Sequence, residues 1–413
     1  RCLSDWSSDV CSSDLTQLNP AAERYHAFDA LRAAMMILGV ALHSATAYST
    51  FPDVWWLKDP AASRWADVFI LFLHSFRLPA FFVMSGFFAA MLLERRGWQG
   101  FLENRAARLG LPFLLCMLAT FPLLKLTSVY CHFWGKDPNP VARVLGWIAE
   151  GRFERSVEPM HLWFLEVLMW VCLLAAALAP RLNRWLGAAW FGQLLRSRMA
   201  PAAFGLVSFV TLLPMEFGIL DTPHNFAPQW RIIGAYAVFF AVGWGLYLHR
   251  EALPELRRGG WGLIALCGPL LIITMAAIDR QMADRTVRHW PALLATALTT
   301  ALSAWLMLFG LMGVFLRHCS DASPRQRYLA DSAYWLYLMH PPVLVLLQVP
   351  MMALPLPGVV KFTLGFGLAL PILFWSYDRF VRSTWVGAVL NGRRYERGFP
   401  AAEPSLVLQP AAD

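Results

Sequence analysis

The chain has 413 residues, of which 58% are hydrophobic and only 15% charged; its net charge is +8 and its mean hydropathy +0.48. This composition is too apolar for a soluble domain, so it excludes an ordinary globular enzyme and predicts an integral membrane protein that lies in the lipid bilayer. The Arg residues cluster between apolar segments rather than along a stripe with interleaved aromatics. They indicate membrane topology and not a nucleic-acid surface.

The two ends of the chain differ from the rest. Residues 1–15, RCLSDWSSDVCSSDL, resemble the translation of a sequencing adapter joined in frame and do not enter the fold prediction. Residues 16–28 lack an apolar core, so they are expected to form a cytoplasmic N-terminal segment rather than a signal peptide. Residues 383–413 end in an Ala/Pro-rich stretch and are expected to form a disordered cytoplasmic tail. The fold prediction therefore concerns one membrane domain at 29–382.

Apolar stretches of about 20 residues, long enough to cross about 30 Å of hydrocarbon, recur along this domain. They are expected near residues 30–50, 67–92, 107–126, 161–180, 202–220, 230–249, 261–279, 292–316, 329–348 and 359–380. Ten spans place both termini on one side of the membrane, and the excess of Lys and Arg in alternate connections makes that side the cytoplasm. The predicted fold is an all-α polytopic membrane protein of about ten transmembrane helices.

The first apolar segment contains Arg32 and His43, eleven residues apart. At 100° per residue both side chains lie on one helical face, roughly 16 Å apart along the axis. Ionisable groups at membrane depth usually face the protein interior or an aqueous cavity, because lipid cannot solvate them. Taken alone, the pair is equally compatible with an Arg near the headgroups and a His hydrogen-bonded inside a helix bundle.

The second apolar segment contains a denser set of polar residues. His74 and Arg77 are three residues apart and therefore neighbours on one face, and Pro79 is expected to kink the helix beside them. Ser85 follows His74 by eleven residues on the same face, and Gly86 permits close approach of another helix. The alternative, a snorkelling Arg beside a structural kink, accounts for fewer of these features.

Two more histidines stand at helix boundaries. His161 and Trp163 lie at the outer end of the fourth segment, where Trp163 could simply anchor the helix at the interface. In the ninth, Tyr337 and His340 share a face, and the prolines at 341–342 are expected to break the helix directly afterwards. A purely structural kink with a buried histidine is the alternative there.

Arg105 and Arg108 lie three residues apart in the connection between the second and third segments, on the expected cytoplasmic side. Such a basic run is by default a solvated face near the lipid headgroups. The functional alternative is a clamp for a phosphate-bearing donor, since Arg binds phosphate through two parallel hydrogen bonds.

These features match a known pattern in their order. The chain resembles the membrane-bound acyltransferase 3 family, and within it the succinyltransferases of periplasmic glucans. The resemblance rests on five features in this order: Arg32 with His43, the motif HSFRLPAFFVMSGFF, Arg105 with Arg108, HLWFL and YLMHPP. The resemblance runs from about Arg24 to Arg382.

The resemblance implies transfer of a succinyl or acetyl group from a cytoplasmic acyl-CoA co-substrate (succinyl-CoA or acetyl-CoA) to a carbohydrate hydroxyl, such as that of a periplasmic glucan or surface polysaccharide. It implies a multi-pass protein of the bacterial inner membrane with no permanently bound cofactor. It also implies that Arg32 and His43 are essential and that Arg105 and Arg108 act on the donor side.

Acyl transfer to a hydroxyl needs a base for that hydroxyl and positive charge for the oxyanion. We expect His43 to be the general base or a transient acyl carrier and Arg77 to stabilise the developing charge, and no Cys/His spacing indicates a metal site. The expected catalytic residues are His43, Arg32, His74, Arg77 and His340; donor binding falls to Arg105 and Arg108, and acceptor binding to His161, Trp163, Tyr337 and Ser85.

Two other functional classes stay open. A proton-coupled transporter or exporter would also place His and Arg inside its spans, but the sequence contains no internal repeat to support one. A structural or sensory membrane protein would tolerate replacement of these buried residues. Nothing in the sequence specifies an oligomeric state.

Overall fold

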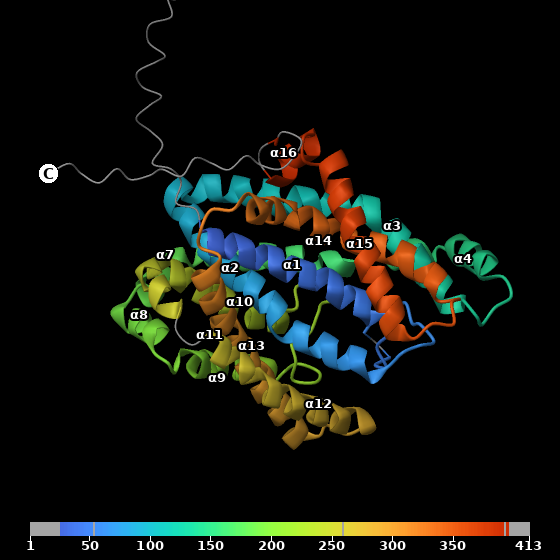
Figure 1. Cartoon of the computed structure of the whole chain (residues 1–413), viewed down its shortest axis with the longest axis horizontal. Coiled ribbons are helices and arrows are strands. Elements are labelled where there is room, and N and C mark those ends of the chain that lie inside the picture. The colour runs from blue at the N-terminus through green and yellow to red at the C-terminus, as the bar shows by residue number, and fades with distance from the viewer. Residues whose placement is uncertain (1–24, 53, 258–259, 392–393, 396–413) are drawn as a thin grey trace, which may run out of the picture.

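The computed structural model describes residues 25–52, 54–257, 260–391 and 394–395, and within these it consists of helices and loops without a strand (Figure 1). The adapter-like segment and the expected N-terminal segment up to residue 24 lie outside the described residues, as does the tail from 396 onward. Extended apolar runs account for this architecture, because a chain crossing hydrocarbon must satisfy its backbone hydrogen bonds internally.

The helices follow one another with short connections. The first half of the chain contains α1 (His26–Thr46), α2 (Arg64–Arg105), the π-helix η1 (Ala106–Gly110), α3 (Leu111–Phe133), α4 (Pro140–Ala149), α5 (Arg152–Arg155), the short 3-10 helix η2 (Met160–Leu162), α6 (Trp163–Ala177), α7 (Ala179–Leu186) and α8 (Ala189–Arg196). The second half contains α9 (Ala200–Leu212), α10 (Trp230–Leu248), the 3-10 helix η3 (Arg250–Arg257), α11 (Gly260–Ala265), α12 (Cys267–Ala283), α13 (Trp290–His318), α14 (Pro324–Met351), α15 (Gly358–Phe380) and α16 (Trp385–Asn391).

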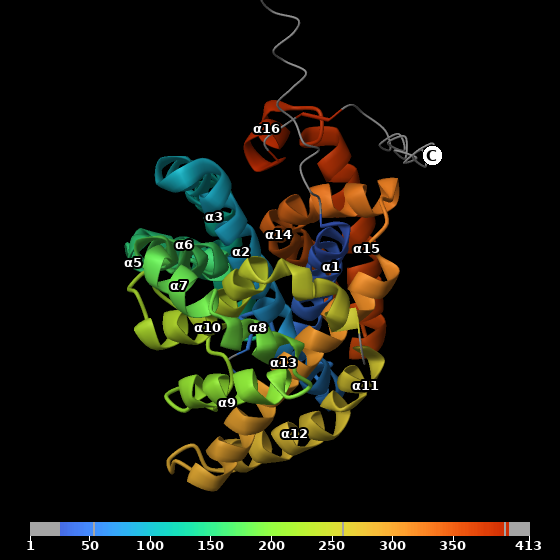
Figure 2. The same ribbon diagram turned by 90° about the vertical axis from the view of Figure 1, so that its left-hand side faces the viewer.

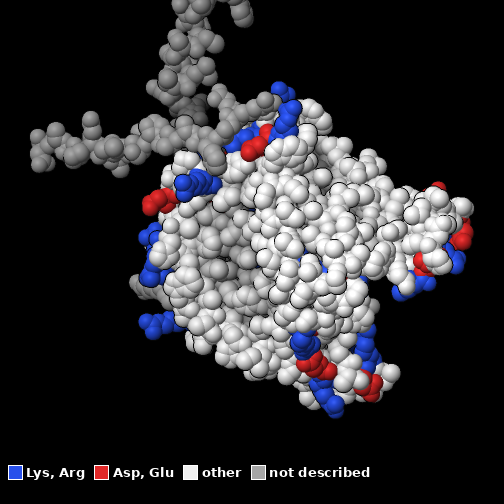
Figure 3. All heavy atoms as spheres, turned by 45° about the vertical axis from the view of Figure 1, so that its right-hand side comes forward, with Lys and Arg blue, Asp and Glu red and all other residues white. Residues whose placement is uncertain are grey.

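Among the described residues, seven helical stretches are long and apolar enough to cross a membrane. They comprise α1, α2 with α3 as one stretch, α5 to α6, α10, α11 to α12, α13 and α15. The remaining expected spans coincide with the shorter α9 and with α14, which carries polar residues and prolines. Figure 3 shows a broad surface almost free of charge, with the acidic and basic side chains gathered together in groups around the margin of the face in view. The all-α polytopic fold is confirmed, while the number of ten crossings stays a prediction.

Helix α1 lies inside the bundle, where it packs against α2, α13, α14 and α15 (Figure 2). The neighbouring crossing of α2 and α10 is unusually close. A Cβ at Gly86 would collide with the carbonyl of Phe240, and one at Gly243 with the carbonyl of Val83. The two backbones therefore touch directly, which confirms the expectation that Gly86 permits close helix approach.

One proline prediction was wrong, because helix α14 continues through Pro341 and Pro342 to Met351. The kink expected at Pro79 stays a prediction: the backbone dihedrals of α2 are helical there, and Gly97 (φ 65°) is the non-helical position inside this helix. Proline removes the N–H that would bond the carbonyl four residues earlier, but a helix can continue where another donor satisfies that carbonyl. In α14 histidine side chains supply those donors, as described below.

The predicted disordered tail was wrong for its first part. Residues Trp385–Asn391 form α16, on which Leu390 is buried. The carbonyl of Val389 accepts a hydrogen bond from Arg108 Nη1 at 3.1 Å, so a basic side chain from the α2–α3 connection attaches the helix to the bundle. Composition alone did not reveal this, because the attachment comes from a residue almost 300 positions away.

Candidate active site

Three histidines from separate elements meet in the bundle. His43 comes from α1, His161 from η2 at the entrance to α6, and His340 from the middle of α14. The ring centroids of His43 and His340 are 5.0 Å apart, and those of His161 and His340 are 5.8 Å apart. His340 is therefore the centre of the cluster, in contact with both others.

The prolines of α14 orient two of these rings. Pro341 and Pro342 leave the carbonyls of Tyr337 and Leu338 without their usual N–H donors. Nδ1 of His340 donates to Tyr337 O at 2.8 Å, and Nε2 of His161 donates to Leu338 O at 3.2 Å. Because a carbonyl can only accept, these bonds fix which ring nitrogen carries the hydrogen.

The opposite nitrogens are consequently available for chemistry. Nε2 of His340, Nδ1 of His161 and Nδ1 of His43 are all buried, and none has a hydrogen-bond partner among the described residues. In an uncharged imidazole, the nitrogen opposite the donor carries a lone pair. Two lone pairs of fixed direction therefore lie beside His43, a suitable environment for accepting or relaying a proton.

Arg77 lies next to this cluster and is only 6% exposed. Its guanidinium passes so close to α1 that a Cβ at Gly39 would collide with Nη1, and it interacts electrostatically with His43 and His340. Within the described part of the chain no carboxylate forms an ion pair with it, and its Nε has no hydrogen-bond partner. A buried cation without a counter-ion is costly, so this position is suited to an anion that arrives with a substrate or forms during a reaction.

A column of side chains on α14 connects the histidines with the basic end of the bundle. Tyr334, Tyr337 and His340 follow at intervals of three residues, with ring centroids 6.3 Å apart at each step. The hydroxyl of Tyr337 donates to His161 O at 2.9 Å, and that of Tyr334 donates to Arg108 O at 2.7 Å. One helix face thus runs from the predicted donor site to the predicted reaction site.

Arg32 and the predicted donor-side residue Arg108 lie near the beginning of α14. Arg32 pairs with Asp29 at 2.9 Å and donates to Ala330 O at 3.4 Å, one turn before the Tyr334 that bonds Arg108. Arg105 lies over the ring of Phe101. Arg108 sits in the π-helix η1, and such irregular turns are frequent at functional sites.

Other predicted site residues are placed apart from the histidine contacts. Nε2 of His74 bonds Leu220 O at 2.7 Å, and His74 lines a separate cavity of about 20 Å³, the size of a single water. Trp163 packs on Tyr236 with ring centroids 5.8 Å apart. Ser85 is half-buried and has no side-chain hydrogen bond in the described residues. The roles predicted for these three stay predictions.

Sequence reasoning missed three residues that shape the site. Gly39 makes room for Arg77, and Tyr236 stacks on Phe82 at 4.5 Å while lying within electrostatic range of Arg77. Trp55, in the loop after α1, contacts the ring of His43 at a centroid distance of 5.1 Å. The spacing of Gly39 one turn before His43 was a usable signal, whereas nothing local linked the other two to the site.

The described residues contain no group of three or more His, Cys, Asp or Glu side chains arranged to hold a metal ion. The site instead combines imidazole lone pairs, the buried guanidinium of Arg77 and, near the beginning of α14, a basic entrance formed by Arg32, Arg105 and Arg108. That combination can deprotonate a hydroxyl and stabilise an anionic transition state.

Comparison with known proteins identifies the family. The acyltransferase domain of the acyltransferase 3 type matches residues 25–378. "Glucans biosynthesis protein C" from Salmonella paratyphi B and from Salmonella typhi are each 24% identical to this chain over 344 residues, covering 78% of this chain and 83% of theirs. No solved structure matches. The chain therefore belongs to the acyltransferase 3 family and is a membrane O-acyltransferase.

Proposed function

We propose that the protein transfers a succinyl or acetyl group from cytoplasmic acyl-CoA to a hydroxyl of a periplasmic glucan or related carbohydrate, in the inner membrane of a bacterium and with both termini in the cytoplasm. The name of the Salmonella relatives supports a glucan acceptor. The observation that carries the proposal is the group of three imidazole nitrogens beside Arg77: within the described part of the chain these nitrogens have no hydrogen-bond partner and Arg77 has no carboxylate partner.

The donor side rests on the basic entrance. Arg32 and Arg108 border successive turns of α14, and Arg108 interacts electrostatically with Arg105. The phosphates of CoA would bind these guanidinium groups, since phosphate and guanidinium form paired, charge-assisted hydrogen bonds. The pantetheine arm would then follow the column formed by Tyr334 and Tyr337 toward His340.

The chemical step uses His43 as the base. The acceptor oxygen forms a bond to the thioester carbonyl carbon while its proton passes to His43, and the carbonyl electron pair becomes an oxyanion stabilised by Arg77. Collapse of this intermediate breaks the carbon–sulfur bond, and the leaving thiolate takes the proton from His43. The products are the carbohydrate ester and free CoA. In this proposal His340 shares the proton, and the contact between its ring and that of His43 supports the role.

His43 could alternatively carry the acyl group on an imidazole nitrogen between two half-reactions. The two routes differ in a single measurement. A carrier releases one equivalent of CoA per protein before any acceptor is added, whereas a general base releases none.

Mass spectrometry of periplasmic glucans and surface polysaccharides tests the proposed function. Cells with the gene should contain carbohydrate that is heavier by a succinyl or acetyl group, and cells without it should lack that mass. A gene carrying His43→Ala should fail to restore it, while His318→Ala, an exposed histidine of α13, should restore it fully. Normal membrane levels of a His43→Ala protein that still acylates would overturn the proposal. Transport of unmodified glucan that depends on the gene would favour an exporter instead.

A further inference from the structure

Two tryptophans in the loop between α1 and α2 border the histidine cluster. Trp55 contacts the His43 ring at 5.1 Å, and Trp56 stacks on Trp55 with centroids 5.0 Å apart and ring planes 23° apart. Both side chains are half-buried, so each retains an accessible part. Together they extend the site from His43 into the loop that follows α1.

The indole nitrogen of Trp55 is the unusual feature. Nε1 is buried and has no hydrogen-bond partner in the described ranges, although a buried indole N–H normally finds an acceptor. Nδ1 of His43 is buried and unpartnered in the same part of the chain. Indole nitrogen can only donate, whereas an uncharged imidazole can accept. A hydroxyl group fits this pair, because it accepts one hydrogen bond and donates another.

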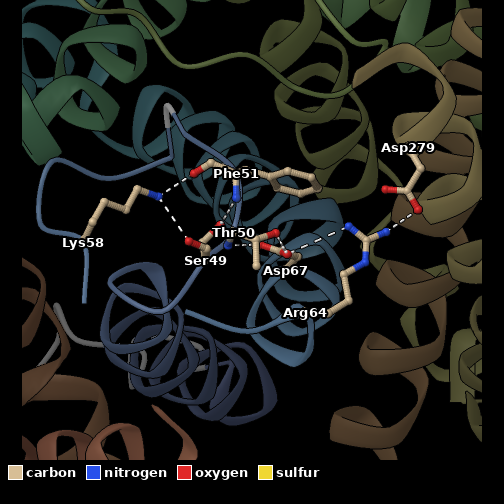
Figure 4. A network of polar contacts seen from close by, with 7 residues as sticks. All are labelled: Ser49, Thr50, Phe51, Lys58, Arg64, Asp67 and Asp279. Atoms are coloured by element: carbon tan, nitrogen blue, oxygen red, sulfur yellow. Dashed lines mark hydrogen bonds and ion pairs between the residues drawn. The ribbon is translucent and has the colours of Figure 1, made fainter. Parts of the chain in front are cut away.

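The loop carrying these rings is held in place by a buried carboxylate. Asp67, at the start of α2, is fully buried and accepts hydrogen bonds from Ser49 Oγ at 2.6 Å and from Thr50 N at 2.9 Å (Figure 4). Arg64 lies 3.9 Å from Asp67 and also pairs with Asp279 of α12. The beginning of the loop is thereby attached to two helices of the bundle.

A second buried group fixes the end of the loop. Nζ of Lys361, on α15, bonds both carboxylate oxygens of Asp59 at 2.9 Å, and neither residue is more than 4% exposed. Nζ of Lys58 bonds the carbonyl of Phe51 within the loop at 2.5 Å. Trp55 and Trp56 therefore stand on a segment anchored at both ends, as a pre-organised binding surface requires.

We propose that Trp55 and Trp56 form the subsite for the acceptor sugar. The apolar face of a sugar ring packs on the accessible part of Trp56, and its reacting hydroxyl accepts a hydrogen bond from Trp55 Nε1 and directs its own proton to His43. This inference rests on the proposed function, because it identifies how that reaction recognises its acceptor. A purely structural role, in which the indoles only complete the loop packing, is the competing outcome of the test.

Kinetics of the full-length protein in nanodiscs test the subsite, with acyl-CoA and a short glucose oligosaccharide each varied in turn while the other is held saturating. Trp56→Ala should raise the oligosaccharide KM about tenfold, the weight of one aromatic stacking contact, without changing the KM for acyl-CoA. Trp55→Phe, which keeps a ring but removes the N–H, should lower kcat/KM for the oligosaccharide alone. Trp65→Phe is the matched control, because Trp65 packs on Tyr48 and Phe362 instead of His43, and it should behave as the unchanged protein.

Other outcomes are decisive too. An oligosaccharide KM unchanged in both Trp55→Phe and Trp56→Ala would overturn the subsite while leaving the transferase intact. If Trp56→Ala does not fold, Trp56→Phe should fold and keep most of the affinity; equal losses of acceptor and donor affinity in that variant would show a structural role. If the unchanged protein transfers no acyl group, the proposed function fails on its own. Quenching of tryptophan fluorescence by the oligosaccharide then decides the subsite, which stands only if Trp55→Phe or Trp56→Ala abolishes the quenching.

Discussion

Two neighbouring regions of this protein contain buried polar groups, and they differ in whether those groups have hydrogen-bond partners. In the loop between α1 and α2, Asp67 is bonded by Ser49 and Thr50, and Asp59 by Lys361. In the histidine cluster, by contrast, three ring nitrogens and Arg77 Nε are buried without partners among the described residues. An unsatisfied buried polar group costs about 1–3 kcal/mol of folding stability. We therefore interpret the hydrogen-bonded groups of the loop as structural supports, and the unpartnered groups of the cluster as positions that a substrate satisfies when it binds. Substitutions in the two regions should therefore have opposite signatures.

Arg77→Met should have the largest effect on activity. Removing the charge that we propose stabilises the oxyanion should lower kcat by about a hundredfold or more. The apparent melting temperature should stay the same or rise, because an unpaired buried charge is removed. Enzyme assays and thermal unfolding of the same nanodisc preparation measure both quantities. Arg77→Lys, which keeps the charge, should retain part of the activity; a large fall in melting temperature for Arg77→Met would place Arg77 with the supporting groups.

Lys361→Met should show the opposite signature. It leaves the Asp59 carboxylate buried without its cation, which should destabilise the protein by about 3–5 kcal/mol and lower the apparent melting temperature. Adding Asp59→Asn should recover most of the loss, because the uncharged amide no longer needs a counter-ion and can still accept from Ala61 N. A single variant as stable as the unchanged protein would show that this pair does not hold the loop.

Pro341→Ala should affect orientation rather than stability. The new N–H can bond Tyr337 O and compete with Nδ1 of His340, so the ring of His340 should become less fixed. We expect kcat to fall a few-fold, with about the same melting temperature. Pro350→Ala, nine residues further along the same helix and beyond the cluster, is the control and should leave kcat unchanged. Equal effects of the two changes would contradict the role assigned to the freed carbonyl.

Ser49→Ala should have the smallest effect. It removes one of the hydrogen bonds to Asp67 but leaves that of the Thr50 N–H, so the expected destabilisation is about 1 kcal/mol. Thermal unfolding measures it, and kcat should not change. A loss of turnover without a loss of stability would mean that this network belongs to the reaction site.

Much of the fold was predictable because its determinants are local. Every apolar segment expected from the sequence overlaps a helix, because length and hydropathy suffice to identify a span, although α9 ends at Leu212 inside the segment expected at 202–220. His43, Arg77, His161 and His340 were likewise recognisable one by one, because ionisable residues are conspicuous in apolar runs. Their meeting was not predictable, because it depends on how α1, α2, η2 and α14 pack.

The sequence-based predictions failed where a residue distant in sequence determines the local structure or the role of a side chain. Proline at 341–342 indicated a broken helix, but His161, from another element, satisfies a carbonyl that the ring leaves free. Trp55 carried no periodic signal, because it lies in a loop and gains its meaning only from contact with His43. In both cases the missing information was tertiary.

The direct crossing of α2 and α10 at Gly86 and Gly243 bears on motion. Helices separated by a layer of side chains can slide as rotamers change, but two backbones in contact have no such layer. We therefore expect α2 and α10 to behave as one rigid body throughout the catalytic cycle. If the proposed donor path along α14 opens during the reaction, we expect the hinge on the side of α14, where side chains make contacts such as Gln348 Nε2 with Ser44 O of α1 and Cys116 Sγ of α3 with Leu338 O. Spin labels on α14 and α10 should report it as a change in distance.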